Sequence, residues 1–175
     1  MLSAGPGTFV NRNKLGSFVR KAEDAPTLPG AHVLMIELTE SVEVTLPGKP
    51  KTTLKAGCYL YCGSAKGPGG IRARLSWHMR PGKLIHWHVD RLTNAGRVTG
   101  AWVFPGRDEC ERVRALSRLC APIRGFGNTD CPKCWSHLLS WPRGARRTTI
   151  AQNLERLDHR ILRQGDWGSI GRGHS

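Results

Sequence analysis

A compact and mainly apolar run, Ala31 to Leu38, most constrains what this 175-residue chain can fold into. A run of this length is typical of a strand buried inside a sheet. Its uncharged part, Val33 to Ile36, is far shorter than the roughly 18 apolar residues that a membrane-spanning helix needs. The Pro29-Gly30 pair directly before it marks the entry to a fold. The run therefore predicts a sheet-containing domain that does not cross a membrane.

Further strand-like segments follow this run. Residues 42–46 alternate in polarity and stop at Pro47-Gly48, which predicts a second strand that closes a hairpin. Residues 58–63 form a third strand rich in aromatic side chains, and residues 98–104 are another candidate. Three strands, two of them joined by a short loop, indicate a small antiparallel sheet.

Helical periodicity begins after a loop of small residues at 63–70. Ile71, Leu75 and Met79 recur at i, i+4 and i+8 and form an apolar stripe, with Arg74 and His78 together on one edge of it. Asp108 is a good N-cap for a helix running to about residue 120. Shorter helical segments are expected at 86–92 and 150–162.

Charge and punctuation divide the chain into three parts. Residues 1–29 are expected to be a basic, flexible leader, residues 30–141 one folded domain, and residues 142–175 a basic tail with a short helix.

With 27 Lys and Arg against 13 Asp and Glu, the net charge of +14 indicates a polyanionic partner, and nucleic acid is the usual one. A membrane surface is a less favoured partner, because the sequence shows no long basic amphipathic helix that could bind one. The absence of an apolar leader and a cysteine pattern typical of reduced thiols favour a cytoplasmic protein.

Glu109 is a candidate ligand for a cation. On a helical wheel it projects in the same direction as Val113, Leu116 and Cys120, whereas Glu111 points to solvent. A carboxylate on an apolar face must be paired, protonated or bound to a metal. The alternative is an ordinary glutamate favoured by the helix dipole. The metal interpretation predicts one hard divalent cation at this position.

Arg74 and Tyr61 are candidates for handling a phosphate. Arg74 offers a planar cation that can grip a phosphate and stabilise developing charge, although a solvated helix arginine is the alternative. Tyr59 and Tyr61 share one face of their strand, and at least one of them is expected only to pack. Tyr61 is preferred because it adjoins Gly63, where a ligand can approach the backbone.

Two polar clusters could also bind a metal. The segment 86–90 holds two histidines and Asp90, and we interpret it as an orienting hydrogen-bond cluster rather than a metal site. Cys131, Cys134 and His137 have a spacing compatible with zinc. A tetrahedral site would need a fourth ligand from elsewhere in the chain.

Five short motifs occur in series along the chain: Gly57-Cys58-Tyr59-Leu60-Tyr61-Cys62-Gly63-Ser64-Ala65; Arg74 with His78; His86-Trp87-His88-Val89-Asp90; Glu109-Cys110-Glu111; and Gly125-Phe126-Gly127 through Asp130-Cys131 to Ser136-His137-Leu138. Together they resemble the DUF123 family, a branch of the GIY-YIG nuclease superfamily. The resemblance covers roughly residues 29 to 141.

The resemblance implies an α/β (α+β) domain with a central three-stranded antiparallel sheet flanked by helices. It also implies metal-assisted hydrolysis of a nucleic-acid phosphodiester. Tyr61 matches the tyrosine of the superfamily's second motif, Arg74 its helix arginine and Glu109 its metal-binding glutamate. The first motif begins Gly-x-Tyr in the superfamily, and here His32 stands at that tyrosine. An imidazole with an unperturbed pKa near 6.5 would suit proton abstraction at neutral pH.

The resulting hypothesis is an endonuclease that uses one Mg²⁺ or Mn²⁺ ion on Glu109, with DNA favoured over RNA. Arg74 stabilises charge, Tyr61 and His32 handle the attacking water, and His78 orients the phosphate or protonates the leaving oxygen. Basic side chains are expected to contact the nucleic-acid backbone: Lys66, Arg72, Arg80 and Lys83. The alternative is a non-catalytic nucleic-acid-binding module that zinc stabilises through Cys131, Cys134 and His137.

Overall fold

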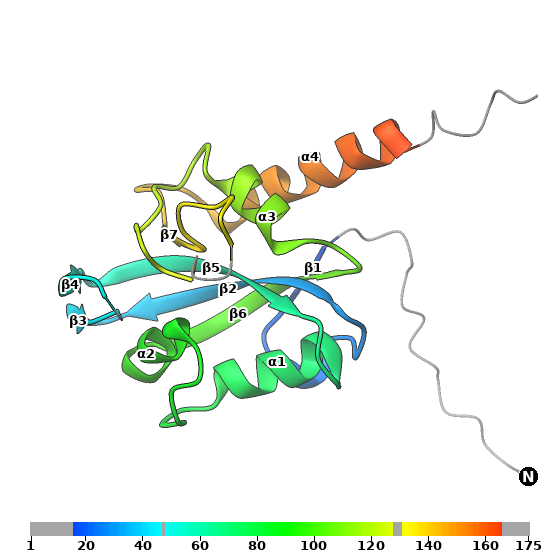
Figure 1. Cartoon of the computed structure of the whole chain (residues 1–175). Coiled ribbons are helices and arrows are strands. Elements are labelled where there is room, and N and C mark those ends of the chain that lie inside the picture. The colour runs from blue at the N-terminus through cyan, green and yellow to red at the C-terminus, as the bar shows by residue number, and fades with distance from the viewer. Residues whose placement is uncertain (1–15, 47, 128–130, 166–175) are drawn as a thin grey trace, which may run out of the picture.

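A five-stranded antiparallel sheet forms the centre of the molecule, in the order β1-β6-β2-β5-β7. The computed structural model describes residues 16–46, 48–127 and 131–165, with side chains to residue 157. The strands are β1 (Ser17–Val19), β2 (Gly30–Leu38), β5 (Gly57–Ala65), β6 (Arg97–Pro105) and β7 (Leu138–Ser140). The three long strands β6, β2 and β5 confirm the expected central antiparallel sheet, and β1 and β7 extend it at its edges (Figure 1).

The predicted second strand does not pair with the apolar run. β3 (Val42–Val44) pairs with β4 (Thr52–Leu54) in a separate two-stranded sheet. β2 instead lies between β5 and β6, each of which is nine residues long like β2 itself. Partners of equal length satisfy almost all of its backbone groups, which a three-residue strand could not do. The predicted pairing was therefore wrong.

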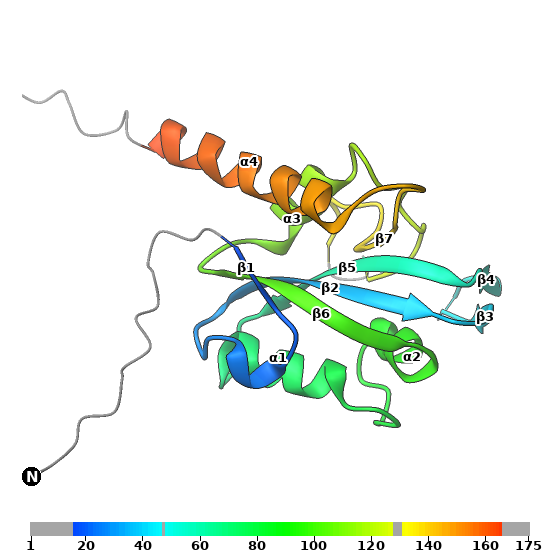
Figure 2. The same cartoon turned by 180° about the vertical axis from the view of Figure 1, so that it is seen from behind.

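Helices cover both faces of the sheet. Figures 1 and 2 show α1 (Gly70–Met79) and α2 (His88–Ala95) below it, and α3 (Glu109–Leu116) and α4 (Arg147–Gly165) above it. The strands contribute side chains to the hydrophobic core on both faces of the sheet, since successive side chains of a strand point to opposite faces. Leu34 and Ile36 pack on the α1 side, whereas Ala31 and Val33 pack on the α3 side.

The folded domain extends beyond the predicted boundaries at both ends. β1 pairs with β6, and Val19 and Ala25 are buried, so residues 17–25 belong to the fold and not to a flexible leader. Residues 1–15 of that predicted leader lie outside the described residues. At the other end, Ile150 and Leu154 on α4 are buried with the side chains of α3. The predicted helix over 150–162 is confirmed as part of α4, and the domain does not end at residue 141.

Within the described ranges, no helix combines the length and the apolar character that crossing a membrane requires.

Candidate functional site

Side chains from four elements meet around one cavity of about 190 Å³. His32 comes from β2, Tyr61 from β5, Arg74 from α1 and Glu109 from α3. These residues are far apart in the sequence, and sequence reasoning predicted that they would share a pocket. The structure brings all of them together, with His78 of α1 beside them. Their convergence leaves their chemical roles open to experiment.

The cavity forms where the sheet has an open edge. β7 pairs with β5 only as far as the pair Tyr61 and Leu138, and within the described part of the chain no other strand pairs with β5 beyond this point on that side. Side chains from the two helical layers can meet around such an edge. Gly63 keeps the space open, because a Cβ there would lie 2.5 Å from Nε2 of His32. Gly127 has a φ of +68°, which suits glycine, and its Cα faces the ring of Tyr61.

His32 is buried without a polar partner. Its exposed fraction is 0%, and among the residues that the structure describes neither of its ring nitrogens has a hydrogen-bond partner. Burial, followed by the nearby His78 and Arg74, holds the pKa of His32 well below its ordinary value of 6.5. The imidazole is therefore neutral at pH 7, with one nitrogen able to accept a proton.

Tyr61 offers a hydrogen-bond donor to the cavity, and Arg74 offers a cation. Burial raises the pKa of Tyr61, so its phenol stays protonated at neutral pH and can donate a hydrogen bond. Arg74 is half-buried, and its guanidinium carbon lies 4.0 Å from the centre of the Trp87 ring. This cation–π contact holds the guanidinium against the ring. Sequence reasoning did not identify Trp87 as the partner of Arg74, since the two residues lie on different elements.

His78 is oriented by Asp90, as the predicted hydrogen-bond cluster requires. Asp90 is fully buried, and its Oδ1 lies 3.1 Å from Nδ1 of His78. Although burial acts to raise the pKa of Asp90, hydrogen bonds from His78 and its other neighbours hold that pKa well below its usual range. An ionised carboxylate only accepts, so Nδ1 of His78 carries the proton and Nε2 is left as an acceptor. The other donors to Asp90 are Nε1 of Trp77 and the backbone N–H groups of His86 and Trp87.

Lys83 is not a surface residue, and its predicted contact with nucleic acid was wrong. Its side chain is 1% exposed, and Nζ donates to the hydroxyl of Thr93 and to the backbone oxygen of His78. Nζ also lies 3.9 Å from Oδ1 of Asp90. A buried ammonium with these partners supports the fold and has no access to a polyanion. The other three predicted contacts, Lys66, Arg72 and Arg80, are exposed.

Glu109 begins α3 and faces the cavity. Asp108 caps the helix as predicted, since its side chain accepts from the backbone N–H groups of Cys110 and Glu111. Val113 and Leu116 are buried on the predicted side of the helix, which ends at Leu116 and not near residue 120, so the buried Cys120 lies beyond it. Oε2 of Glu109 is buried, and no described residue gives it a hydrogen bond. A buried carboxylate oxygen without a protein partner fits a cation as its missing ligand.

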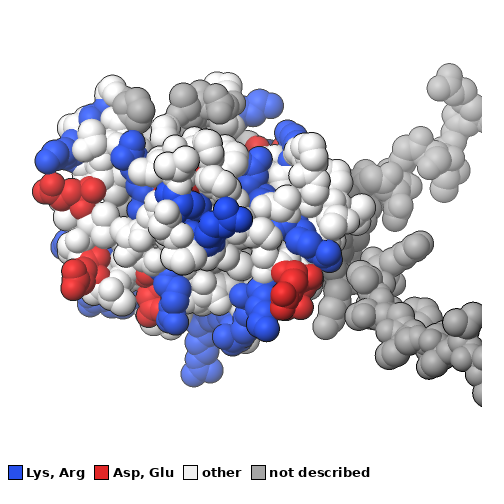
Figure 3. Space-filling view, turned by 90° about the horizontal axis from the view of Figure 1, so that it is seen from below, with Lys and Arg blue, Asp and Glu red and all other residues white. Residues whose placement is uncertain are grey.

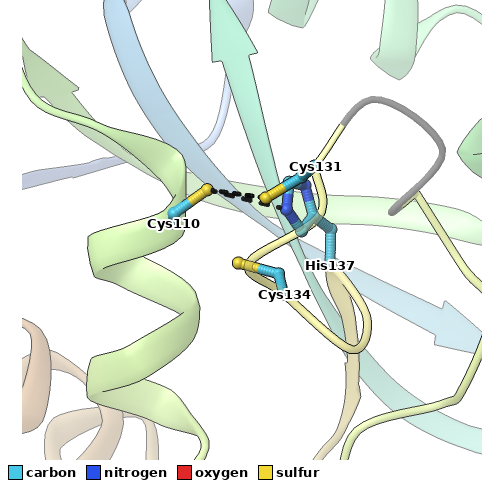
Figure 4. A group of neighbouring side chains, drawn as sticks. All are labelled: Cys110, Cys131, Cys134 and His137. Atoms are coloured by element: carbon cyan, nitrogen blue, oxygen red, sulfur yellow. Dashed lines mark hydrogen bonds between the residues drawn. The ribbon is translucent and has the colours of Figure 1, made fainter.

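A second group of side chains could hold a metal such as zinc (Figure 4). It consists of Cys110, Cys131, Cys134 and His137, whose ligand atoms all lie within 4.8 Å of one another. Cys110 supplies the fourth ligand that the predicted trio of residues lacked. Sequence reasoning missed it because it lies on α3, 21 residues before Cys131. Cys110 directly follows Glu109 and is not part of the regularly spaced group Cys131, Cys134 and His137.

Basic side chains are spread over the face that carries α1. In Figure 3, which views this face, Lys and Arg side chains recur across it and at its centre, and Asp and Glu side chains lie toward its margin. Arg74 connects this face to the cavity, because it also lines a larger hollow of about 280 Å³ with Trp77 and Trp87. The cavity therefore opens beside a cationic surface with aromatic side chains.

Comparison with known proteins places this architecture in a family. The family described as "Domain of unknown function DUF123" matches residues 31–159. This range includes most of α4 and every strand of the central sheet except β1. No curated protein and no solved structure matches the chain. The match covers well over half of the 175 residues, and the chain belongs to the DUF123 family.

Proposed function

We propose that this protein is a metal-dependent endonuclease of the GIY-YIG type, which hydrolyses phosphodiester bonds in nucleic acid, with DNA favoured over RNA. One observation carries the proposal. A guanidinium, three imidazoles, a phenol and a carboxylate line a single cavity, and both ring nitrogens of His32 and Oε2 of Glu109 have no protein partner among the described residues. Polar atoms left without partners in a buried site are those that a substrate or ion can satisfy.

The size of the cavity favours a phosphate over a larger ligand. A volume of about 190 Å³ is below the roughly 300–1,000 Å³ of typical small-molecule pockets. A single phosphodiester and its attacking water fit this space, while the rest of a polymer runs along the basic surface outside. The net charge of +14 supports the same class of partner.

Each side chain has a role that its protonation state permits. Arg74 binds a non-bridging phosphate oxygen and stabilises the charge that develops there, with its guanidinium held against the ring of Trp87. Neutral His32 accepts the proton of the attacking water, as a weaker base than a free imidazole because burial lowers its pKa, and the protonated phenol of Tyr61 donates a hydrogen bond that orients the water. His78 presents Nε2 to the site with Asp90 behind it.

Glu109 would hold one Mg²⁺ or Mn²⁺ ion through its unpartnered oxygen. When bound there, such an ion would supply positive charge next to the phosphate.

A cleavage assay tests the proposal. The full chain is incubated with single-stranded, double-stranded and branched DNA and with RNA, with Mg²⁺, with Mn²⁺ or with neither. Cleavage of at least one substrate that requires the ion and is lost in Arg74→Ala supports the proposal. Binding without cleavage of any substrate would contradict it and favour the alternative of a non-catalytic binding module.

A further inference from the structure

We propose that Cys110, Cys131, Cys134 and His137 form a closed structural zinc site that fixes the first turn of α3 to the sheet and thereby positions Glu109. The effect on Glu109 rests on the function proposed above, whereas zinc binding itself does not.

The geometry of the four ligand atoms suits one tetrahedral ion. Sγ of Cys110 lies 3.2 Å from Sγ of Cys131 and 4.0 Å from Nε2 of His137. Zinc–sulfur bonds of about 2.3 Å in a tetrahedron place the sulfur atoms roughly 3.8 Å apart. The Cys110–Cys131 separation is shorter than that value, and no two ligand atoms of the group lie more than 4.8 Å apart, so shifts of up to about 1 Å would complete the site.

A disulfide explains the cluster less well. The sulfur atoms of Cys110 and Cys131 are 3.2 Å apart, well beyond the S–S bond length of about 2.05 Å, and all the cysteines of the cluster are free. A disulfide would also use only two of the four converging side chains. Figure 4 shows Cys134 and His137 directed at the same point as the other two residues.

The donor set indicates a structural role. Three thiolates and one imidazole fill all four positions of a tetrahedral zinc ion, which leaves no open position for water or substrate. A catalytic zinc keeps such a position open. The hydrolytic ion is therefore assigned to Glu109 and not to this cluster.

Among the four ligands, His137 is held to its neighbours by backbone hydrogen bonds. The backbone oxygen of His137 accepts from the N–H of Cys62 on β5, and the N–H of His137 donates to the backbone oxygen of Phe126. The hydroxyl of Ser136 bonds to that same oxygen. Cys110 is on α3, so an ion shared by Cys110 and His137 links the helix to β5.

This link acts directly on Glu109, the residue before Cys110. No described residue hydrogen-bonds to its Oε2, so the direction of its carboxylate depends on where α3 begins. A link at the next residue fixes that start. We therefore regard Cys110 as a positioning residue for Glu109.

The first experiment measures zinc in the full chain, purified without chelators and also reconstituted with ZnSO₄. We expect one zinc per chain, with an X-ray absorption spectrum of three sulfur ligands and one nitrogen ligand. Cys110→Ser and Cys134→Ser should lose the zinc, Cys110→His should keep it, and the control Cys58→Ser, a cysteine outside the cluster, should bind as the wild type does. Absence of zinc from the folded wild-type chain, or a Cys110–Cys131 disulfide found by mass spectrometry, would overturn the site.

The second experiment measures Mn²⁺ binding by electron paramagnetic resonance, which separates positioning from catalysis. We expect at least a tenfold weaker Mn²⁺ affinity in Cys110→Ser and recovery in Cys110→His. Should Cys110→Ser fail to fold, removal of zinc from the wild type with a chelator gives the same comparison. Unchanged Mn²⁺ affinity without zinc would overturn the positioning role. Cleavage by a zinc-free chain refutes the positioning role alone, and zinc binding without any cleavage refutes the nuclease alone.

Discussion

Two buried polar regions lie side by side in this domain and differ in how their polar atoms are satisfied. Around Asp90, the carboxylate accepts hydrogen bonds from side chains and backbone, and Lys83 has partners as well. In the cavity, both ring nitrogens of His32 and Oε2 of Glu109 have no partner in the described part of the chain. Unsatisfied buried groups cost stability, and their presence in the cavity supports the ligand proposed above. His78 connects the two regions.

Replacing the carboxylate of the unsatisfied region should have the largest effect on activity. We expect Glu109→Gln to reduce cleavage by roughly 10³-fold, since the change removes the charge that binds the divalent ion. The melting temperature should fall little, because Oε2 of Glu109 makes no hydrogen bond to a described residue. Glu111→Gln, in the same helical turn but outside the cavity, is the control. Equal activity in the two variants would remove Glu109 from the mechanism.

The satisfied region should respond in the opposite way. We expect Asp90→Asn to lower the free energy of unfolding by about 3 kcal/mol, because it removes the charge that His78 and buried Lys83 face. Urea unfolding followed by tryptophan fluorescence measures this. A stable Asp90→Asn variant that lost only activity would show that this cluster is catalytic and would end the contrast between the two regions.

Acid should destabilise the protein through His32. Its pKa is lower in the folded chain than the unfolded value of 6.5, so between these values the unfolded chain binds more protons. The free energy of unfolding should therefore be largest above about pH 6.5 and should fall as the pH is lowered below it. The pKa of His78 is also lowered by burial and adds to the same trend. Denaturation at a series of pH values should give a shallower fall for His32→Asn, and an unchanged slope would show that His32 does not titrate as described.

The smallest expected effect concerns the surface outside both regions. Lys66 is exposed directly after β5, and we expect Lys66→Met to weaken DNA binding slightly and to reduce the slope of log affinity against log salt by about 1. Titrations at several salt concentrations measure it. Lys83→Met should instead lower stability and leave that slope unchanged, because Lys83 is buried. The reverse pattern would show that the two lysines have been assigned to the wrong regions.

Local patterns predicted much of this molecule. The apolar run at β2, the cap at Asp108 and the helical stripe of α1 depend on neighbouring residues, so the sequence alone reveals them. The resemblance to the family pointed to His32, Tyr61, Arg74 and Glu109, which share the cavity. What the sequence did not reveal depends on tertiary packing. Lys83 is buried by residues from another helix, and β3 pairs with a strand that had not been predicted.

The proximity of Cys110 and Cys131 also depends on tertiary packing. Neither the distance between these thiols nor the stacking of Arg74 on Trp87 follows from sequence spacing, because each joins two different elements. Burial and contact at such positions require the fold itself.

The most direct test of the central claim is a crystal structure of the full chain soaked with Mn²⁺. The account predicts an anomalous-scattering peak roughly 2.2 Å from a carboxylate oxygen of Glu109, inside the cavity lined by Tyr61 and Arg74. A Mn²⁺-soaked crystal with no peak at Glu109, or with peaks only elsewhere on the surface, would contradict it.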